Sequence, residues 1–72
     1  MLDQIMEMLR KYSDTTEISP DSNLKSDLGL DSFQLVSIVV EIEDTLGVTI
    51  EESKVPDFVV VRDIAEYLDR RA

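Results

Sequence analysis

The sequence predicts an all-α domain of three main helices and one short helix, with a long ordered loop after the first helix. Two observations lead to this prediction. Apolar residues recur at helical spacing in three separate segments, and 72 residues leave room for one small domain only. We therefore expect residues 1–72 to form a single domain, and its elements follow in chain order.

The first helix is predicted over residues 2–12. Its apolar residues recur every three or four positions, and charged residues occupy much of the rest of the helical wheel. The apolar positions are Leu2, Ile5, Met6, Leu9 and Tyr12. Breakers and small polar residues then dominate from about residue 14 to residue 30. Because long loops are uncommon in compact domains unless they have a function, we expect this loop to be ordered, with Ile18, Leu24 and Leu28 in the core.

The central helix is predicted over residues 32–46. Part of this segment alternates like a strand, but Val39 breaks the alternation, and fifteen residues is long for a strand. The helical interpretation has better ends, because Asp31 can cap the start and Gly47 stands at the stop. One face of the wheel gathers apolar residues and must be the core face. It consists of Leu35, Ile38, Val39, Ile42 and Leu46.

The same helix has apolar residues on its other side. Phe33, Val36 and Val40 fall well away from the core face. Ser37 and Asp44 lie alongside them. Two interpretations remain open, a helix buried on two sides or a partly exposed apolar stripe that meets partners. We favour the stripe, and we expect Val36, nearest the core edge, to be the most easily buried of the three.

Two further helices complete the predicted fold. A short helical turn is expected within residues 51–57, around Pro56, after an extended link at residues 48–50. The last helix is expected over residues 61–70. Its apolar face consists of Val61, Ile64, Ala65 and Leu68. Residues 58–61, Phe-Val-Val-Val, are strand-like in composition, and we interpret them as an apolar approach to a helix that lacks an evident N-cap.

The charge of the chain excludes several classes of partner. Seven basic and sixteen acidic residues give a net charge of −9. Such a chain repels phosphate backbones and anionic lipid surfaces, so we expect no nucleic-acid binding and no membrane insertion, and basic protein surfaces are its natural partners. No secretory leader is visible, and no apolar run approaches the ~20 residues that span a bilayer. We expect a monomer in the cytoplasm.

The residue types leave little for catalysis. The absence of Cys and His removes thiolate nucleophiles, imidazole bases and the usual zinc ligands. Ser32 is the obvious candidate nucleophile, yet Lys25 is the only basic side chain within ten residues of it. Residues 21–32 begin like a calcium-binding loop, but Lys25, Ser26 and Ser32 occupy three positions that need other residues. We therefore expect neither an enzyme nor a metal site.

Ser32 has a second interpretation. At the start of a helix, free backbone N–H groups and the positive end of the dipole favour an attached phosphate. The plain alternative is a serine that merely caps the helix or stands in its first turn. The residues around Ser32 decide between these two interpretations.

Residues 27–33, Asp-Leu-Gly-Leu-Asp-Ser-Phe, resemble the D-L-G-x-D-S-L signature of acyl carrier proteins. The resemblance extends over nearly the whole chain, through residues 18–24, 41–50 and 64–68. It implies a four-helix carrier-protein bundle. It also implies that Ser32, with Asp31 as its motif neighbour, receives 4′-phosphopantetheine from coenzyme A through a separate phosphopantetheinyl transferase. The arm then carries an acyl group as a thioester on its terminal thiol.

The resemblance also implies a partner-facing surface on the central helix. Its positions match Phe33, Ser37, Val40, Glu41 and Asp44, and the helical wheel independently places them away from the core. No Lys or Arg occurs between residues 26 and 53, where acidic residues are frequent. We therefore expect acyl-loading and acyl-processing enzymes to dock here through basic patches.

Departures from the family pattern leave the pathway open among fatty-acid, polyketide and related biosynthesis. Phe33 replaces the usual Leu, and both Gln34 and Ser37 are uncharged. Other classes also stay open. They are a peptidyl or D-alanyl carrier and an unmodified carrier-fold domain that binds partners through the apolar stripe. A small hydrolase that uses Ser32 is disfavoured by the missing base.

Overall fold

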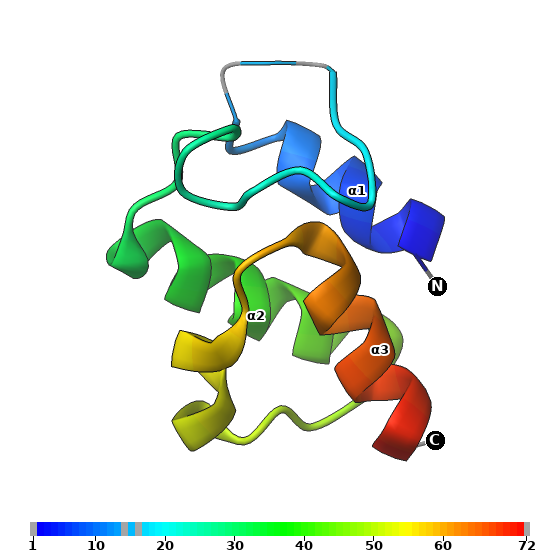
Figure 1. Cartoon of the computed structure of the whole chain (residues 1–72). Helices are drawn as coiled ribbons and strands as arrows, with labels where there is room; N and C mark the ends of the chain where they lie inside the picture. Colours follow the sequence, from blue (N-terminus) through cyan, green and yellow to red (C-terminus); the bar gives the residue numbers. More distant parts are fainter. Residues whose placement is uncertain (1, 14, 16, 72) are drawn as a thin grey trace.

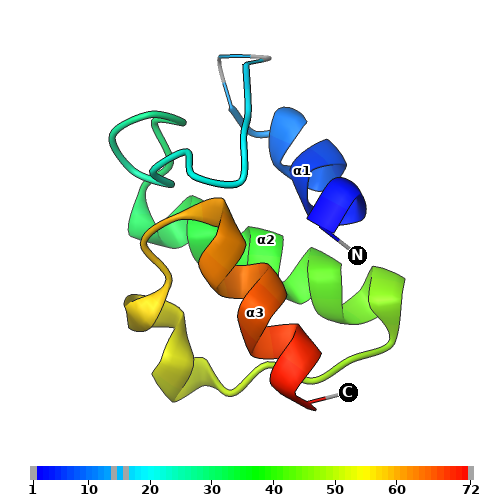
Figure 2. The ribbon, with the colours of Figure 1, turned by 45° about the vertical axis from the view of Figure 1, so that its right-hand side comes forward.

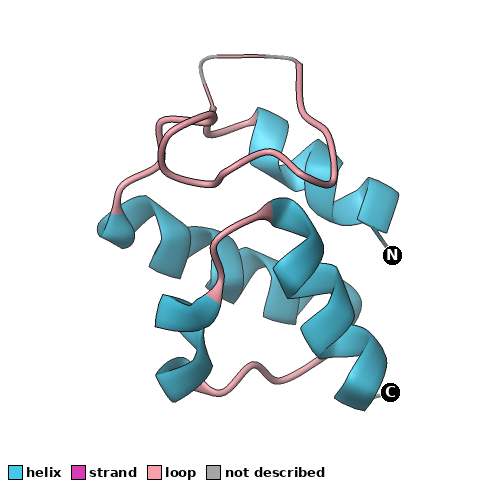
Figure 3. Cartoon of the chain, in the orientation of Figure 1, coloured by secondary structure: helices cyan, strands magenta, loops and turns pink. Residues whose placement is uncertain are grey.

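The chain folds into helices alone in the computed structural model, which describes residues 2–13, 15 and 17–71. In chain order they are α1 (Leu2–Arg10), α2 (Ser32–Leu46), the 3₁₀ helix η1 (Glu52–Asp57) and α3 (Val61–Arg71). Figure 3 shows helices and loops and no strand within these described residues. The predicted all-α class, with three main helices and one short helix, is confirmed.

The central element of the bundle is α2. Figures 1 and 2 show α3 crossing in front of α2. In both views α1 and the long first loop lie in the upper part of the molecule, next to the N-terminal end of α3. Helix α1 packs against both α2 and α3, and η1 packs against α2. Buried apolar side chains from all four helices and from the first loop form one core. Within the described part of the chain, no helix is long and apolar enough to cross a membrane.

Both ends of α2 match the residues expected there. The carboxylate of Asp31 accepts the N–H of Gln34 at 2.7 Å, and the side-chain oxygen of Gln34 accepts the N–H of Asp31 at 3.1 Å. This reciprocal pair is a capping box. Gly47 ends the helix with a φ of 67°, a left-handed conformation that glycine adopts without strain. The buried residues of the helix are Leu35, Ile38, Val39 and Ile42.

The first helix is shorter than predicted. It ends at Arg10, because the next two N–H groups bond to carbonyls three residues back rather than four. Met8 is buried and Met6 is only half-buried, although the prediction included Met6 and omitted Met8. On the helical wheel Met6 and Met8 flank the direction of Ile5 and Leu9 at equal angles, so the helical period alone does not decide which of the two methionines is buried.

The long first loop packs on the core from Ile18 onward, as predicted, while residues 14 and 16 of the predicted loop lie outside the described residues. Leu24 and Leu28 are buried, and Ile18 is half-buried against them. Leu30, at the end of the loop, is buried as well. These side chains anchor the segment that leads directly into α2.

The loop also completes the start of α3. The N–H of Val61 donates to the carbonyl of Ser22 at 3.1 Å, and the N–H of Arg62 donates to the carbonyl of Pro20 at 2.8 Å. The first N–H groups of a helix have no partner inside the helix, so the loop supplies main-chain acceptors for them. The loop and α3 are therefore joined by hydrogen bonds as well as by apolar contacts.

The last helix has no capping side chain at Val60, as expected, but Asp63 in its first turn forms part of a capping arrangement. Its carboxylate accepts the N–H groups of Val59 and Val60, at 2.9 and 3.0 Å. An acidic residue in the first turn that bonds back to the residue before the helix forms half of a capping box. The sequence signal was present, because Asp63 stands three residues after Val60.

Candidate functional site

Ser32 is the first residue of α2, and its side chain is exposed. Asp31 is the capping residue, so Ser32 is not the N-cap but stands in the first turn, the other position that the plain alternative named. Within the described residues, the hydroxyl of Ser32 makes no hydrogen bond. The positive end of the helix dipole and the unpaired N–H groups of the first turn stabilise an anion at this place. Ser32 therefore presents a free hydroxyl where a phosphate ester would be stabilised.

An open cavity of about 370 Å³ lies beside Ser32. Its walls come from the start of α2, from η1, from residues 58–59 and from the first loop at residues 23–25. Most of the lining side chains are apolar. They are Leu35, Val36, Val55, Pro56, Phe58 and Val59. The cavity was not predicted, because its walls come from three separate segments of the sequence, residues 23–25, 32–36 and 52–59.

The outer face of α2 has an exposed apolar stripe. Phe33 is 83% exposed and Val40 is 49% exposed, so the interpretation of α2 as buried on two sides is wrong. Val36 is 47% exposed, which makes it the least exposed of the three without being buried. Ser37 and Asp44, which lie alongside, are also exposed. These residues form one continuous surface along the helix.

Glu41 lies at the edge of this surface, and its carboxylate makes hydrogen bonds with residues of the same chain. Its carboxylate accepts hydrogen bonds from the ammonium group of Lys11 at 2.9 Å and from the hydroxyl of Tyr12 at 2.8 Å. These two hydrogen bonds, that of Lys11 first, lower the pKa of Glu41. The same contact with Glu41 raises the pKa of Lys11. Glu41 therefore connects the end of α1 to α2, and much of its charge is already balanced.

The stability that this connection provides is expected to depend on acid pH. Because the pKa of Glu41 in the folded chain lies below its ordinary value of 4.5, the ionised carboxylate stabilises the fold above that value, and the effect is lost as the pH falls through the folded pKa. The groups are largely exposed, so the effect is small. We expect Glu41→Gln to lower the free energy of unfolding near pH 7, and we expect this difference to diminish towards pH 3.

Urea unfolding at the two pH values measures this difference. The matched control is Glu66→Gln, which changes an exposed glutamate on α3 that makes no hydrogen bond among the described residues. A difference between the native protein and Glu41→Gln that stays constant from pH 7 to pH 3 would contradict the assignment.

A hydroxyl that caps nothing, at the positive end of a helix and beside an apolar cavity, is typical of a protein that carries a phosphate-linked group. Residues 2–68 match the family described as "Phosphopantetheine attachment site". The chain is 36% identical over 56 residues to an acyl carrier protein of Micrococcus luteus, with 78% of this chain and 69% of that protein covered. It is 37% identical over 57 residues to an acyl carrier protein of Aster yellows witches'-broom phytoplasma, with 79% of this chain and 75% of that protein covered.

The chain therefore belongs to the acyl carrier protein family. Its prosthetic group is covalently attached 4′-phosphopantetheine, and it is a carrier rather than a catalyst. The residues at the start of α2 fit this group, because an exposed hydroxyl, the positive end of a helix and an open cavity meet there.

Proposed function

We propose that Ser32 is the attachment site of 4′-phosphopantetheine and that the chain delivers acyl thioesters on this arm to partner enzymes. The observation that carries the proposal is the exposed Ser32 hydroxyl, which is free of hydrogen bonds within the described residues, at the start of α2. Asp31 contributes by capping the helix, which leaves the serine hydroxyl free to react. We propose that this carrier is cytoplasmic. We also propose that it is a monomer, because a net charge of −9 opposes self-association.

Attachment requires a separate phosphopantetheinyl transferase. In this reaction Ser32 Oγ forms a bond to the β-phosphorus of coenzyme A, the P–O bond of the diphosphate breaks, and adenosine 3′,5′-bisphosphate leaves. In this proposal the hydroxyl proton passes to a base of the transferase. When bound, the arm supplies the thiol on which the acyl group is held.

The cavity beside Ser32 supports an acyl cargo. Its walls are mainly apolar, with Val36 on α2, Val55 in η1 and Val59 before α3 among them. Burial of each CH₂ group of a chain in such a site contributes about 0.8 kcal/mol. A D-alanyl group has a charged ammonium that loses hydration there. This lining therefore favours an acyl chain over the D-alanyl alternative.

The proposal is tested on the native chain by intact mass. Incubation with coenzyme A, magnesium and a broad-specificity transferase is expected to add one phosphopantetheinyl group, which fragmentation then locates on Ser32. Subsequent acylation is expected to give a product that hydroxylamine cleaves, as a thioester requires. A chain that gains no mass with either this transferase or the one from its own organism would be an unmodified interaction domain.

Docking of partners is proposed for the outer surface of α2. Phe33 and Val40 supply exposed apolar contacts, and Asp44 supplies an exposed acidic group with no ion pair among the described residues. Ser37 lies between them. Glu41 lies at the edge of the surface, where an ion pair with Lys11 partly neutralises its charge. Apolar residues with an acidic neighbour suit an enzyme surface with a basic patch.

Asp44→Lys is expected to slow association with the transferase. The change reverses a charge on the docking surface, and we expect an association rate lower by about ten-fold at low ionic strength. The difference should shrink near 0.5 M salt, where the screening length falls well below ~10 Å. Stopped-flow measurements over a salt series test this prediction.

The matched control for this charge reversal is Asp69→Lys, which makes the same change of net charge at an exposed site on α3. Glu41→Lys is expected to have a smaller electrostatic effect than Asp44→Lys, because Lys11 already balances Glu41. Equal slowing by the variants at residues 44 and 69 would show that overall charge, rather than this surface, steers the partner.

A further inference from the structure

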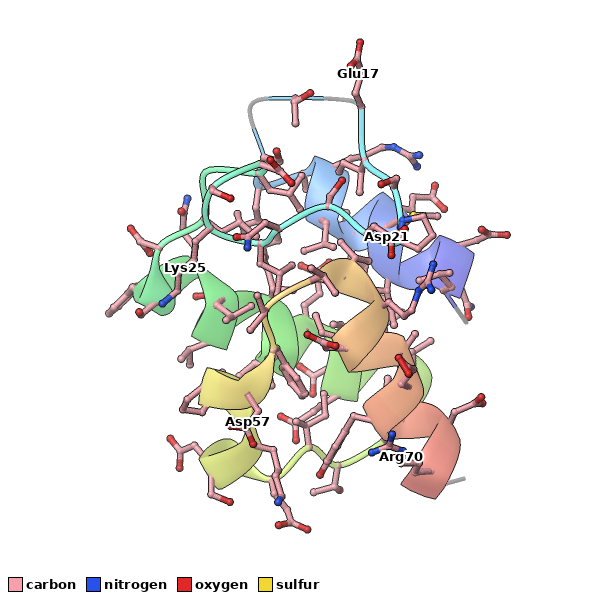
Figure 4. The ribbon with its side chains drawn as sticks, in the orientation of Figure 1. Glu17, Asp21, Lys25, Asp57 and Arg70 are labelled. Atoms are coloured by element: carbon pink, nitrogen blue, oxygen red, sulfur yellow. The ribbon has the colours of Figure 1, made fainter. Side chains whose placement is uncertain are left out.

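Lys25 is an isolated cation beside the proposed attachment site. It is the only Lys or Arg between Tyr12 and Lys54. It is exposed and lines the same cavity as Ser32, and Figure 4 shows it beside the N-terminal end of α2. Within the part of the chain that the structure describes, its ammonium group makes no ion pair and no hydrogen bond. Neither the attachment reaction at Ser32 nor docking on the outer surface of α2 uses this charge.

The backbone of Lys25 is fixed by a closely bonded turn. The side-chain oxygen of Asn23 accepts the N–H groups of Lys25 and Ser26, at 2.9 Å each. The carboxylate of Asp27 accepts the N–H of Asn23 at 2.7 Å. The N–H of Gly29 donates to the carbonyl of Lys25 at 3.0 Å, and Gly29 leaves the turn with a φ of 69°. The main chain at Lys25 is therefore held in place, and only the rotamer of its side chain has to change when a ligand binds.

The charged residues around the cavity are not evenly distributed, so a phosphodiester on Ser32 is attracted to one wall of the cavity and repelled from another. The phosphodiester adds a negative charge to a chain whose net charge is already −9. Asp31 precedes the serine directly, and Glu52 places a carboxylate on the η1 wall of the cavity. Both carboxylates repel the phosphodiester, and Lys25 on the loop wall attracts it. The charges thus draw the first part of the arm towards the loop wall of the cavity.

We propose that the ammonium group of Lys25 pairs with the phosphodiester on Ser32 and holds the first part of the arm over the cavity rather than over the outer surface of α2. Lys25 is then a positioning residue for the prosthetic group. This inference rests on the proposed attachment at Ser32. It predicts that the pantoyl methyl groups, which follow the phosphodiester, lie near Val36 and Val59 on the cavity wall.

The test compares the loaded native protein with the loaded variants Lys25→Met and Lys54→Met. Lys54 is the matched control, because it is an exposed cation on η1 and is not part of the lining of this cavity. Intact mass first establishes that each protein is loaded. The readouts are the ³¹P chemical shift of the phosphodiester and the nuclear Overhauser effects between the pantoyl methyl groups and the methyl groups of Val36 and Val59.

We expect the native protein and Lys54→Met to give the same ³¹P shift and the same Overhauser effects at low salt. In Lys25→Met we expect the Overhauser effects to fall by about two- to five-fold, since an exposed charge pair changes a population by about that factor. High salt should bring the native protein to the values of Lys25→Met.

Each other outcome overturns the inference. Unchanged spectra in loaded Lys25→Met would leave attachment intact and refute the role of Lys25. Equal losses in both variants would assign the effect to overall charge rather than to Lys25. A native chain that gains no mass would refute attachment itself, and the role of Lys25 with it.

Discussion

Replacement of Ser32 by alanine is expected to abolish attachment of the prosthetic arm and to leave the fold unchanged. If the arm is attached at Ser32 as proposed, the phosphodiester cannot form without the Oγ atom of this residue. The fold is expected to persist because Asp31, and not Ser32, caps α2, and because the serine hydroxyl makes no hydrogen bond within the described residues. Alanine is also the residue best suited to a helix. The loss of loading is therefore expected to be complete, and not a matter of degree.

Intact mass after incubation with coenzyme A, magnesium and a transferase measures this loss. The matched control is Thr45→Ala, which removes another exposed hydroxyl from the same helix, outside the docking surface, and should leave loading complete. Circular dichroism and the melting temperature should be the same for both variants and the native chain. Loading of Ser32→Ala would show that the arm is attached elsewhere, and loss of loading in both variants would show that the loss is not specific to Ser32.

The largest loss of stability among the changes considered is expected from Ile42→Ala. The Ile42 side chain is 0% exposed, and it lies on the core face of α2. Truncation of a buried isoleucine to alanine lowers the free energy of unfolding by about 2–5 kcal/mol. The core of a domain of this size supplies a stability of only roughly 3–5 kcal/mol. We therefore expect a large part of the Ile42→Ala population to be unfolded at 25 °C.

Two further substitutions are expected to destabilise the fold less than Ile42→Ala does. Ile42→Val removes one methyl group and is expected to lower the free energy of unfolding by about 0.5–1.5 kcal/mol, which keeps the variant folded. Val40→Ala changes a half-exposed residue on the opposite face of the helix, where about 0.5 kcal/mol or less is expected. Urea unfolding of the three variants gives the order. If Val40→Ala were as destabilising as Ile42→Ala, the assignment of the two faces would be wrong.

The ends and faces of α2 could be predicted because their signals are local. Asp31 and Gly47 each act on the backbone within a few residues of themselves. The outer stripe was likewise predictable, because the helical period alone determines which side chains lie opposite the core. For the site, the motif around Ser32 predicts the residue, and the structure adds that its hydroxyl is free among the described residues.

Other features depend on contacts between distant segments and could not be predicted in this way. The acceptors for the first N–H groups of α3 are the carbonyls of Pro20 and Ser22, and main-chain carbonyls leave no mark in the sequence. Glu41 was expected on the partner-facing surface, and only the packing of α1 shows that Lys11 and Tyr12 reach it. The cavity beside the serine has the same origin, because it exists only when three separate segments are brought together.

The hydrogen bonds between the first loop and α3 have a consequence for how the chain folds. They join residues 20 and 22 to residues 62 and 61, across most of the chain, so a large loop must close before they form. The first turn of α3 gains these two acceptors only when the first loop has docked, and it loses them when that loop leaves. We therefore expect the loop and the first turn of α3 to open and close together. Displacement of residues 20–22 from their place would thus remove support from the first turn of α3, more than forty positions along the chain from Pro20.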